Sequence, residues 1–236
     1  MKRDPAVAMV AGVGPGLGTA LCQTFLASGY RVASLARTPA AAAPLARQFG
    51  PDAFRPFTCD LTDADSVGEA FSRLEQAWEP ASVLIYNAGE FLAKPIGETS
   101  VEAFDHLWAI NCRGAFLCAS RAATTMLQRG SGTIIFSGAT AGVKAAAHCS
   151  AFGSSKFALR GLAQALAREL APRGVHVAHV VIDGILWTPR TQGWPGVEQQ
   201  RCLDPDAVAE TYLHLVRQHR SAWTLELDLR PDVEPF

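Results

Sequence analysis

The 236-residue sequence has no long run of basic residues, no hydrophobic segment of membrane-spanning length and no cysteine pair with CxxC spacing. Its formal net charge is −1, and lysine and arginine are dispersed, which argues against a surface for nucleic acid or anionic lipid. The N-terminal run "AVAMVAG" is too short for a membrane span, and no signal-peptide cleavage pattern accompanies it. We therefore expect a cytoplasmic protein that binds neither nucleic acid nor a membrane.

The six cysteines are scattered along the chain and show no metal-ligand spacing. We expect them to be reduced and mostly buried, as small apolar side chains in a reducing compartment. No metal site is predicted. The six are Cys22, Cys59, Cys112, Cys118, Cys149 and Cys202.

Short apolar runs alternate with longer helical stretches over the whole chain. With 49% hydrophobic and 18% charged residues, the composition suits a single domain over residues 1–236. Continuous apolar strands separated by helices predict a doubly wound, Rossmann-like α/β sheet of about seven parallel strands, with helices on both faces. Ligands of such sheets bind beyond the carboxyl ends of the strands. The expected strands lie within residues 6–12, 30–37, 53–61, 81–89, 132–140, 174–184 and 222–229.

The motif "AGVGPGLG", residues 11–18, joins the first strand to a helix that begins near Leu17. Its glycines, Gly12, Gly14, Gly16 and Gly18, let the backbone approach a pyrophosphate, and the helix N-terminus favours the negative charge. A glycine-rich turn can also be only a tight connection. Because a strand precedes it and a helix follows, we predict a dinucleotide site.

Two further positions bear on the adenosine half of such a dinucleotide. Arg37 ends the second strand, where an acidic residue would bind the ribose of NAD; an arginine can pair with a 2′-phosphate, or can be a solvated surface residue. NADP(H) is thus favoured over NAD(H). Asp60 either accepts from the adenine amino group, with Leu61 beside the ring, or caps the next helix, a role that Thr62 and Asp63 also fit.

The chain resembles the short-chain dehydrogenase/reductase family over nearly its whole length. The resemblance implies a hydride-transfer site for a small molecule, with a nicotinamide cofactor. It also implies a homodimer or homotetramer that pairs through the helices carrying Asn111 and Lys156. The matching residues are Gly12, Gly16, Gly18, Asp60, Asn87, Ala88 and Gly89 of "NAG", Asn111, Lys156, and "DGILWTP" at residues 183–189, which adds Gly184, Ile185 and Thr188 to the expected cofactor site.

The family's catalytic set is incomplete in this sequence. The resemblance implies a proton-transferring tyrosine, a lysine four residues later that binds the nicotinamide ribose, a serine that bonds the substrate oxygen, and an asparagine that holds a water linked to the lysine. Lys156 and Asn111 are present, whereas Phe152 takes the tyrosine position and Ala139 the serine position. The sequence therefore contains the residues that the resemblance implies for cofactor binding but lacks the implied proton donor.

Other groups can be considered as substitutes for the missing donor. Thr140 lies past the strand and could reach the site, whereas Ser137 is out of register. His148 could relay a proton or be a solvent-exposed loop residue. Asp183 could be a base or bond a backbone amide. A water held by Lys156 and Asn111 needs no further residue.

Two hypotheses follow from these observations. The first is an NADP(H)-dependent oxidoreductase with an atypical active site, acting on a small, apolar carbonyl, alcohol or activated alkene. The second is a catalytically silent NADP(H)-binding protein that acts as a sensor or partner subunit. Residues 186–205 are the expected substrate loop, in which Trp187 and Trp194 either line an apolar pocket or anchor the loop.

Overall fold

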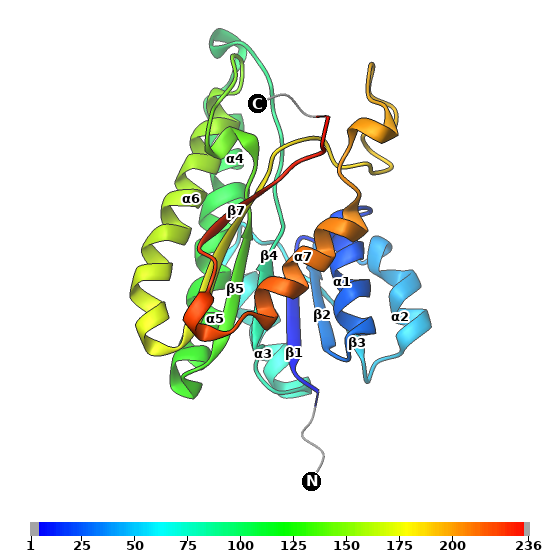
Figure 1. Ribbon diagram of the computed structural model, residues 1–236, viewed down its shortest axis with the longest axis vertical. Coiled ribbons are helices and arrows are strands. Elements are labelled where there is room, and N and C mark those ends of the chain that lie inside the picture. Colours follow the sequence, from blue (N-terminus) through cyan, green and yellow to red (C-terminus); the bar gives the residue numbers. More distant parts are fainter. Residues whose placement is uncertain (1–4, 234–236) are drawn as a thin grey trace.

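All seven predicted strands are present in the computed structural model, which describes residues 5–233. They pair in parallel into one sheet with the order β3-β2-β1-β4-β5-β6-β7 (Figure 1). The prediction of a doubly wound, Rossmann-like α/β sheet is confirmed. The strands are β1 (Val7–Ala11), β2 (Arg31–Ala36), β3 (Phe54–Thr58), β4 (Val83–Tyr86), β5 (Gly132–Ser137), β6 (Val175–Ile182) and β7 (Glu226–Leu229).

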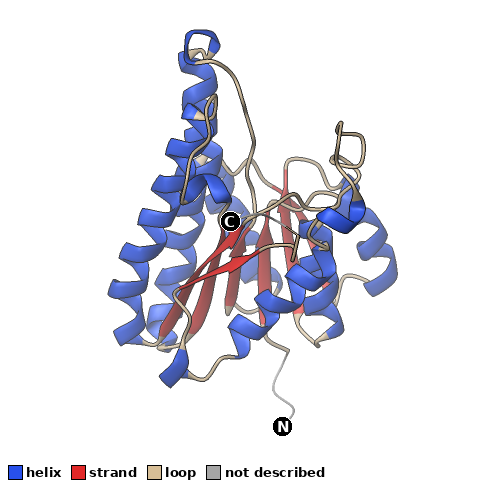
Figure 2. Cartoon of the chain, turned by 45° about the horizontal axis from the view of Figure 1, so that its top comes forward, coloured by secondary structure: helices blue, strands red, loops and turns tan. Residues whose placement is uncertain are grey.

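Helices cover both faces of the sheet (Figure 2). One core cluster joins the sheet to α3, α5 and α6, and a second joins its other face to α1, α2 and α7. The helices are α1 (Leu17–Ala27), α2 (Ala43–Phe49), α3 (Ala64–Ala77), α4 (Val101–Trp108), α5 (Gly114–Arg129), α6 (Ser150–Leu170) and α7 (Pro205–Arg217), with the short helices η1 (Ala40–Ala42), η2 (Ile96–Glu98), η4 (Thr140–Gly142), η5 (Ala171–Arg173), η6 (Gln199–Arg201) and η7 (Arg220–Ala222).

The uninterrupted apolar character of the strands follows from this two-sided cover. In β1 every residue is buried. Met9 belongs to the core on the α5 side, whereas its neighbours Ala8 and Val10 belong to the core on the α1 side. Successive side chains of a strand point to opposite faces, so a strand covered on both faces needs apolar residues at every position.

The helix predicted to run to about Gln128 is interrupted at Asn111. It consists of α4, a π-helical turn η3 (Ala109–Arg113) and α5, which ends at Arg129 with Gly130 in the left-handed region at φ 65°. A π-turn changes the backbone hydrogen-bonding pattern and is frequent at functional sites. Asn111 therefore stands at the single irregular turn of an otherwise continuous helical segment.

The leucine stripe of α6 faces the sheet. Leu159 and Leu170 are fully or almost fully buried, and Leu162 and Leu166 pack against the same core. These four leucines therefore pack on the sheet.

The segment at 186–205 forms a loop closed at its base. Leu186 and Leu203 form an isolated parallel bridge, and the Trp187 amide donates to the Leu203 carbonyl at 2.9 Å. Because the two ends of the loop are tied together, its middle can lie over the carboxyl end of the sheet.

All six cysteines are free, and four of them are buried. Within residues 5–233, no cluster of three or more His, Cys, Asp or Glu side chains is arranged as a metal site. In the same part of the chain, none of the helices combines the length and apolarity that crossing a bilayer requires.

Candidate functional site

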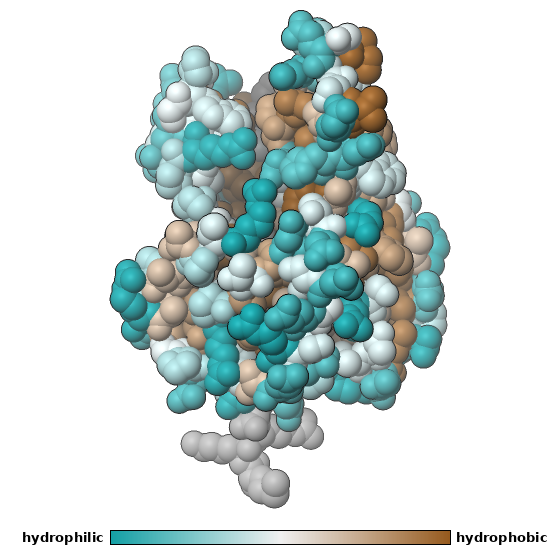
Figure 3. Space-filling model, turned by 180° about the vertical axis from the view of Figure 1, so that it is seen from behind, coloured by the Kyte–Doolittle hydropathy of each residue, from teal (hydrophilic) through white to brown (hydrophobic). Residues whose placement is uncertain are grey.

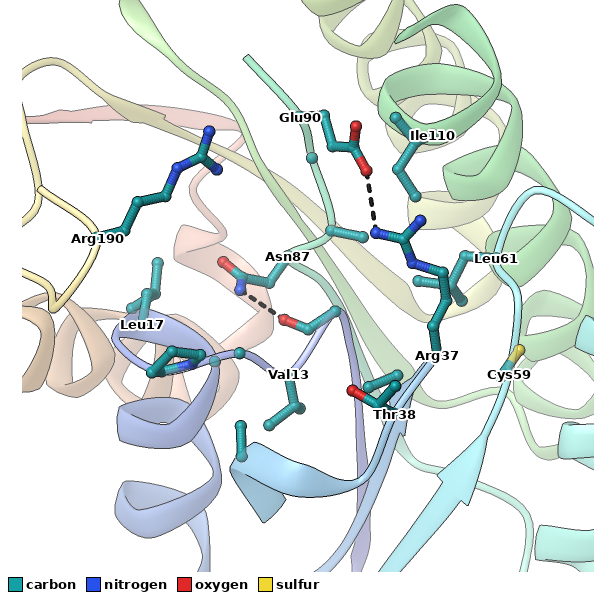
Figure 4. A pocket seen from close by; sticks show the side chains of 18 of the residues that line it. Val13, Leu17, Arg37, Thr38, Cys59, Leu61, Asn87, Glu90, Ile110 and Arg190 are labelled. Atoms are coloured by element: carbon teal, nitrogen blue, oxygen red, sulfur yellow. Dashed lines mark hydrogen bonds and ion pairs between the residues drawn. The ribbon is translucent and has the colours of Figure 1, made fainter. Parts of the chain in front are cut away.

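A cavity of about 660 Å³ opens beyond the carboxyl ends of β1 to β4 (Figure 4). Strand order reverses between β1 and β4, which is where doubly wound sheets bind ligands. Many of the predicted cofactor residues line this cavity, namely Gly12, Gly14, Leu17, Gly18, Arg37, Asp60, Leu61, Asn87, Ala88, Gly89 and Thr188.

Four predicted cofactor residues lie outside this lining, and one of them, Lys156, is described below with α6. Gly16, at φ 120°, packs against Thr188, so it shapes the cavity through that neighbour. Gly184 faces Pro231, where an added Cβ would lie 2.9 Å from the proline Cδ. Ile185 is exposed. The part of the β6–α7 connection that reaches the cavity is Leu186, Thr188 and Arg190, slightly later in the chain than predicted.

The glycine-rich turn shows two separate needs for glycine. Gly12 has φ 92°, and a Cβ there would collide with the backbone of Ala88 at the end of β4. Gly14 has no neighbour within 4 Å of such a Cβ, so its missing side chain keeps the cavity open. The first glycine is therefore required by packing and the second by access to the backbone, which suits a bulky anion such as a pyrophosphate.

Asn87 ties the central strands together. Its Nδ2 donates to the Gly12 carbonyl at 3.0 Å, and the Ser137 hydroxyl donates to its Oδ1 at 3.1 Å. The same hydroxyl is 2.8 Å from the buried Tyr212 hydroxyl of α7. The Ser137 hydroxyl is thus engaged by Asn87 and by Tyr212 on α7.

Asn111 is completely buried, and both N–H groups and the oxygen of its side-chain amide are hydrogen-bonded. Its Oδ1 accepts from the Glu90 amide at 2.9 Å, and its Nδ2 donates to the Glu90 carbonyl and to Ser155 Oγ, both at 3.0 Å. In the same turn, the Tyr86 hydroxyl donates to the Ile110 carbonyl at 2.5 Å. The side chain of Asn111 therefore fixes the loop after β4 against α6.

Lys156 lies one helical turn after Phe152 in α6 and is only 5% exposed. Its Nζ donates to the Ser137 carbonyl at 3.0 Å. Gly89 leaves room for the ammonium group, since a Cβ there would lie 3.3 Å from Nζ. Burial lowers the Lys156 pKa to about 8, because the charged form loses its hydration.

Phe152 belongs to an aromatic cluster at the end of the site near Lys156. Its ring meets the Phe91 ring edge-on with centroids 5.1 Å apart, and the Trp194 ring lies 6.4 Å from Phe91. Lys156 Nζ is 6.0 Å from the centre of the Phe152 ring, at the outer limit of a cation–π contact. Of the two tryptophans in the 186–205 loop, Trp194 is the one that joins this cluster.

Thr140 and Asp183 are engaged with each other. The Thr140 hydroxyl donates to Asp183 Oδ1 at 2.6 Å, and Arg230 forms an ion pair with Asp183 Oδ2. The hydrogen bond from Thr140, with help from Arg230, lowers the Asp183 pKa below its usual range. The two readings of Asp183 weighed from the sequence, a base or a partner of a backbone amide, both miss these side-chain partners, and a stabilised carboxylate is a poor base.

His148 is exposed in the loop before α6. Its backbone has φ 66°, in the left-handed region that favours glycine, and its carbonyl accepts from the Lys94 amide at 2.7 Å. This arrangement fits the loop-residue alternative. The nearby Ala139 has an extended backbone and no side-chain hydroxyl to offer.

Arg37 and Asp60 both have protein partners in the cavity. Arg37 Nη2 is 3.2 Å from Glu90 Oε1. Asp60 Oδ1 accepts from the amide and hydroxyl of Thr62, which lowers the Asp60 pKa, whereas Asp63 caps α3 through the Ser66 amide. Asp60 is therefore not the helix cap.

Sequence reasoning missed three groups near the site. Glu90 and His106 line the cavity, with Glu90 Oε2 and His106 Nε2 3.0 Å apart, and the ring centre of Phe91 lies 6.4 Å from that of Trp194. Glu90 directly follows the "NAG" motif, but nothing in the sequence indicates where its side chain points.

A separate charge cluster joins α6 to β6 and β7. The buried His179 bonds Glu226 at 2.9 Å, and Arg160 binds the same carboxylate through two nitrogens.

A doubly wound sheet with a glycine-lined crevice at its switch point defines the class of Rossmann-like nucleotide-binding proteins. Within that class, the chain belongs to the short-chain dehydrogenase family of oxidoreductases, whose family model, "short chain dehydrogenase", matches residues 6–196.

Individual relatives agree with this assignment. D-threitol dehydrogenase of Mycolicibacterium smegmatis is 32% identical over 197 residues, which cover 83% of this chain and 76% of the relative. A short-chain dehydrogenase from Rhodopseudomonas palustris superimposes with a TM-score of 0.81 at 33% identity, covering 97% and 99% of the two chains. A metagenomic short-chain oxidoreductase in complex with NADP gives a TM-score of 0.83 at 25% identity, covering 97% and 98%.

Proposed function

We propose that this chain binds NADP(H) in the cavity beyond β1 to β4 and uses it to reduce or oxidise a small apolar carbonyl, alcohol or activated alkene. The observation that carries the proposal is the contrast within the site. The glycine turn, Asn111 and Lys156 are in place, while Phe152 and Ala139 offer no proton donor.

The residues present fit such a cofactor. Gly14 opens the cavity to a pyrophosphate, and Leu61 and Ile110 offer apolar surface for an adenine ring. Arg37 at the end of β2 can pair with a 2′-phosphate. The metagenomic relative in complex with NADP supports the same preference.

The bound cofactor supplies or accepts a hydride, and this chain's own residues have to manage the proton. Lys156 Nζ has donors left besides its bond to the Ser137 carbonyl, so it can hold the nicotinamide ribose. With Phe152 beside it, a proton has to come from Lys156 or from a water that Lys156 orients. An activated alkene needs less acid catalysis than a simple ketone, which favours substrates of that kind.

The aromatic cluster favours an apolar substrate. Phe91 and Trp194 are 46% and 37% exposed, so they offer apolar surface next to Phe152. Figure 3 shows apolar side chains inside the hollow between the two upper lobes of the molecule. The 186–205 loop, through Trp194, acts as the substrate loop.

Trp194→Ala is expected to raise the KM for an apolar substrate about tenfold while leaving kcat and the KM for NADPH within about twofold, since the lost contact is apolar burial. Steady-state kinetics checks this. Trp187→Ala is the matched control, because Trp187 lies in the same loop outside the cluster. Equal effects of the two substitutions would contradict a specific contact by Trp194.

The deciding experiment follows NADPH absorbance with a panel of enones, ketones and aldehydes, alongside direct titration of NADPH. Turnover of an enone supports the oxidoreductase. Tight binding without turnover supports the alternative, a silent NADP(H)-binding sensor or partner subunit, which the loss at Phe152 and Ala139 favours. Failure to bind any nicotinamide cofactor would exclude both.

We further propose that the chain forms a homodimer or homotetramer through α4, α5 and α6. These helices lie together on one flank of the molecule (Figure 1), and their outer face carries exposed apolar residues at helical spacing. They are Val101, Phe104, Trp108, Phe116 and Phe157.

Replacing Phe116 and Phe157 together by glutamate is expected to convert the oligomer to monomer, because four carboxylates would face one another in a paired interface. Light scattering after size-exclusion chromatography gives the mass of each form. A wild-type protein with the mass of one chain would contradict the proposed assembly.

A further inference from the structure

The side chain of Glu90 extends into the candidate cofactor cavity and pairs with Arg37, the arginine that the 2′-phosphate of NADP(H) would need. Figure 4 shows Glu90 and Arg37 pointing toward each other across the cavity. Oε1 is 3.2 Å from Arg37 Nη2, and Oε2 is 3.0 Å from His106 Nε2. The Glu90 carboxylate thus connects the loop after β4 with Arg37 at the end of β2 and with His106 in α4.

The backbone of Glu90 is held rigidly. Asn111 bonds both its amide and its carbonyl, and also holds Ser155 on α6. The bond to Ser155 is buried and the two bonds to Glu90 are partly buried, while the side chain of Glu90 lines the cavity. The position of Glu90 is therefore a built feature of the site and does not depend on its ion pair with Arg37.

The ion pair itself is weak enough to exchange. The side chains of Arg37 and Glu90 are 68% and 35% exposed, and an ion pair as exposed as this one stabilises the folded state only slightly, because water screens it. A phosphate dianion is a stronger partner for a guanidinium group than one carboxylate oxygen. A 2′-phosphate can therefore displace Glu90 from Arg37. The Glu90 carboxylate still weakens its binding, because it competes for the arginine and repels the phosphate.

We propose that Glu90 is a specificity-determining residue that competes with the 2′-phosphate of NADP(H) for Arg37 and so narrows the preference for NADP(H) over NAD(H). The proposal rests on the proposed function, because it assumes that the adenosine half of the cofactor lies in this cavity. Asn111 is then a positioning residue, because its side chain holds the backbone of Glu90.

The test is titration of wild-type protein and Glu90→Gln with NADPH and with NADH. Glu90→Gln keeps the size of the side chain and removes its charge. We expect NADPH to bind about three- to tenfold more tightly and NADH to change less than about twofold, since NADH has no phosphate to compete. Glu98→Gln, an exposed glutamate outside the cavity, is the matched control and should change neither affinity.

A second arm asks whether the effect runs through Arg37. In an Arg37→Ala background, Glu90→Gln should no longer favour NADPH, which a double-mutant cycle measures directly. Weaker NADH binding in Glu90→Gln would show that Glu90 binds the ribose and would overturn the proposal. So would equal changes for both cofactors, or none. A wild-type protein that binds neither cofactor would overturn the proposed function as well.

Discussion

Lys156→Met is expected to lower kcat at least about 100-fold for any substrate that the wild-type protein reduces. Lys156 is the only ammonium group that the described residues place beside Gly89 and the carboxyl end of β5. With phenylalanine at 152, Lys156 is the group that we propose to supply or orient the proton, and a positioned acid contributes about 10²–10⁴ in rate. The measurement is single-turnover oxidation of bound NADPH.

The same substitution should not unfold the protein. Since burial lowers the Lys156 pKa to about 8, the unfolded chain binds more protons than the folded one between about pH 8 and the usual lysine pKa. Stability therefore rises with pH across that window, and the charged lysine is a cost at pH 7. We expect Lys156→Met without cofactor to be more stable than wild type, on the order of 1–3 kcal/mol at pH 7.

The pH profile separates Lys156 from other proton donors. If its ammonium group provides or orients the proton, kcat for reduction should fall as the pH rises through about 8, because the amine is then neutral. Lys94→Met, at an exposed lysine, is the control and should keep this profile. A descending limb that persists in Lys156→Met would assign the proton to another group.

The double change Phe152→Tyr with Ala139→Ser is expected to raise the rate of simple ketone reduction by about 10²-fold or more. Tyrosine has nearly the same size and shape as Phe152, whose ring centre lies 6.0 Å from Lys156 Nζ, and it would add a hydroxyl to that ring. The serine would add a donor for the developing oxyanion, worth roughly 10²–10³. Rates are compared for the wild type, both single variants and the double variant.

The gain should be far larger in the double variant than the two single gains suggest, because such groups act as a unit. NADPH affinity should stay within about twofold throughout, since neither position lines the cofactor cavity. Unchanged ketone reduction, with NADPH still bound, would show that the rest of the site, for instance the contact of Phe152 with Phe91, is no longer arranged for this chemistry.

Much of the fold could be predicted because it depends on local pattern. The two-sided burial of β1 requires an apolar residue at each position, and the backbone turn after β1, with φ 92° at residue 12, favours glycine there. Both requirements are visible as composition in short windows. The same holds for the switch from strand to helix at Leu17, whereas the cap of α3 was left open among Asp60, Thr62 and Asp63, and the structure shows that it is Asp63.

The side-chain partners in the site could not be predicted in this way. Glu90 meets Arg37 across 53 positions of the chain, Thr140 meets Asp183 across 43 and Arg230 meets Asp183 across 47. Each pair forms because the sheet brings the ends of different strands to one edge. The sequence contains each charged residue but does not indicate its partner, so Arg37 was assigned to a 2′-phosphate or to solvent, and Asp183 to a backbone amide or to the role of a base.

The sequence by itself determined the parallel sheet, the glycine turn and the absence of a hydroxyl at 152 and 139, since these follow from residue type and spacing. Only the tertiary structure decided that the Asn111 amide hydrogen-bonds Glu90 and Ser155, that burial lowers the Lys156 pKa, and that the Phe152 ring packs against Phe91. The physical reason is that desolvation and hydrogen bonding depend on which atoms surround a group, and packing between distant segments sets those neighbours.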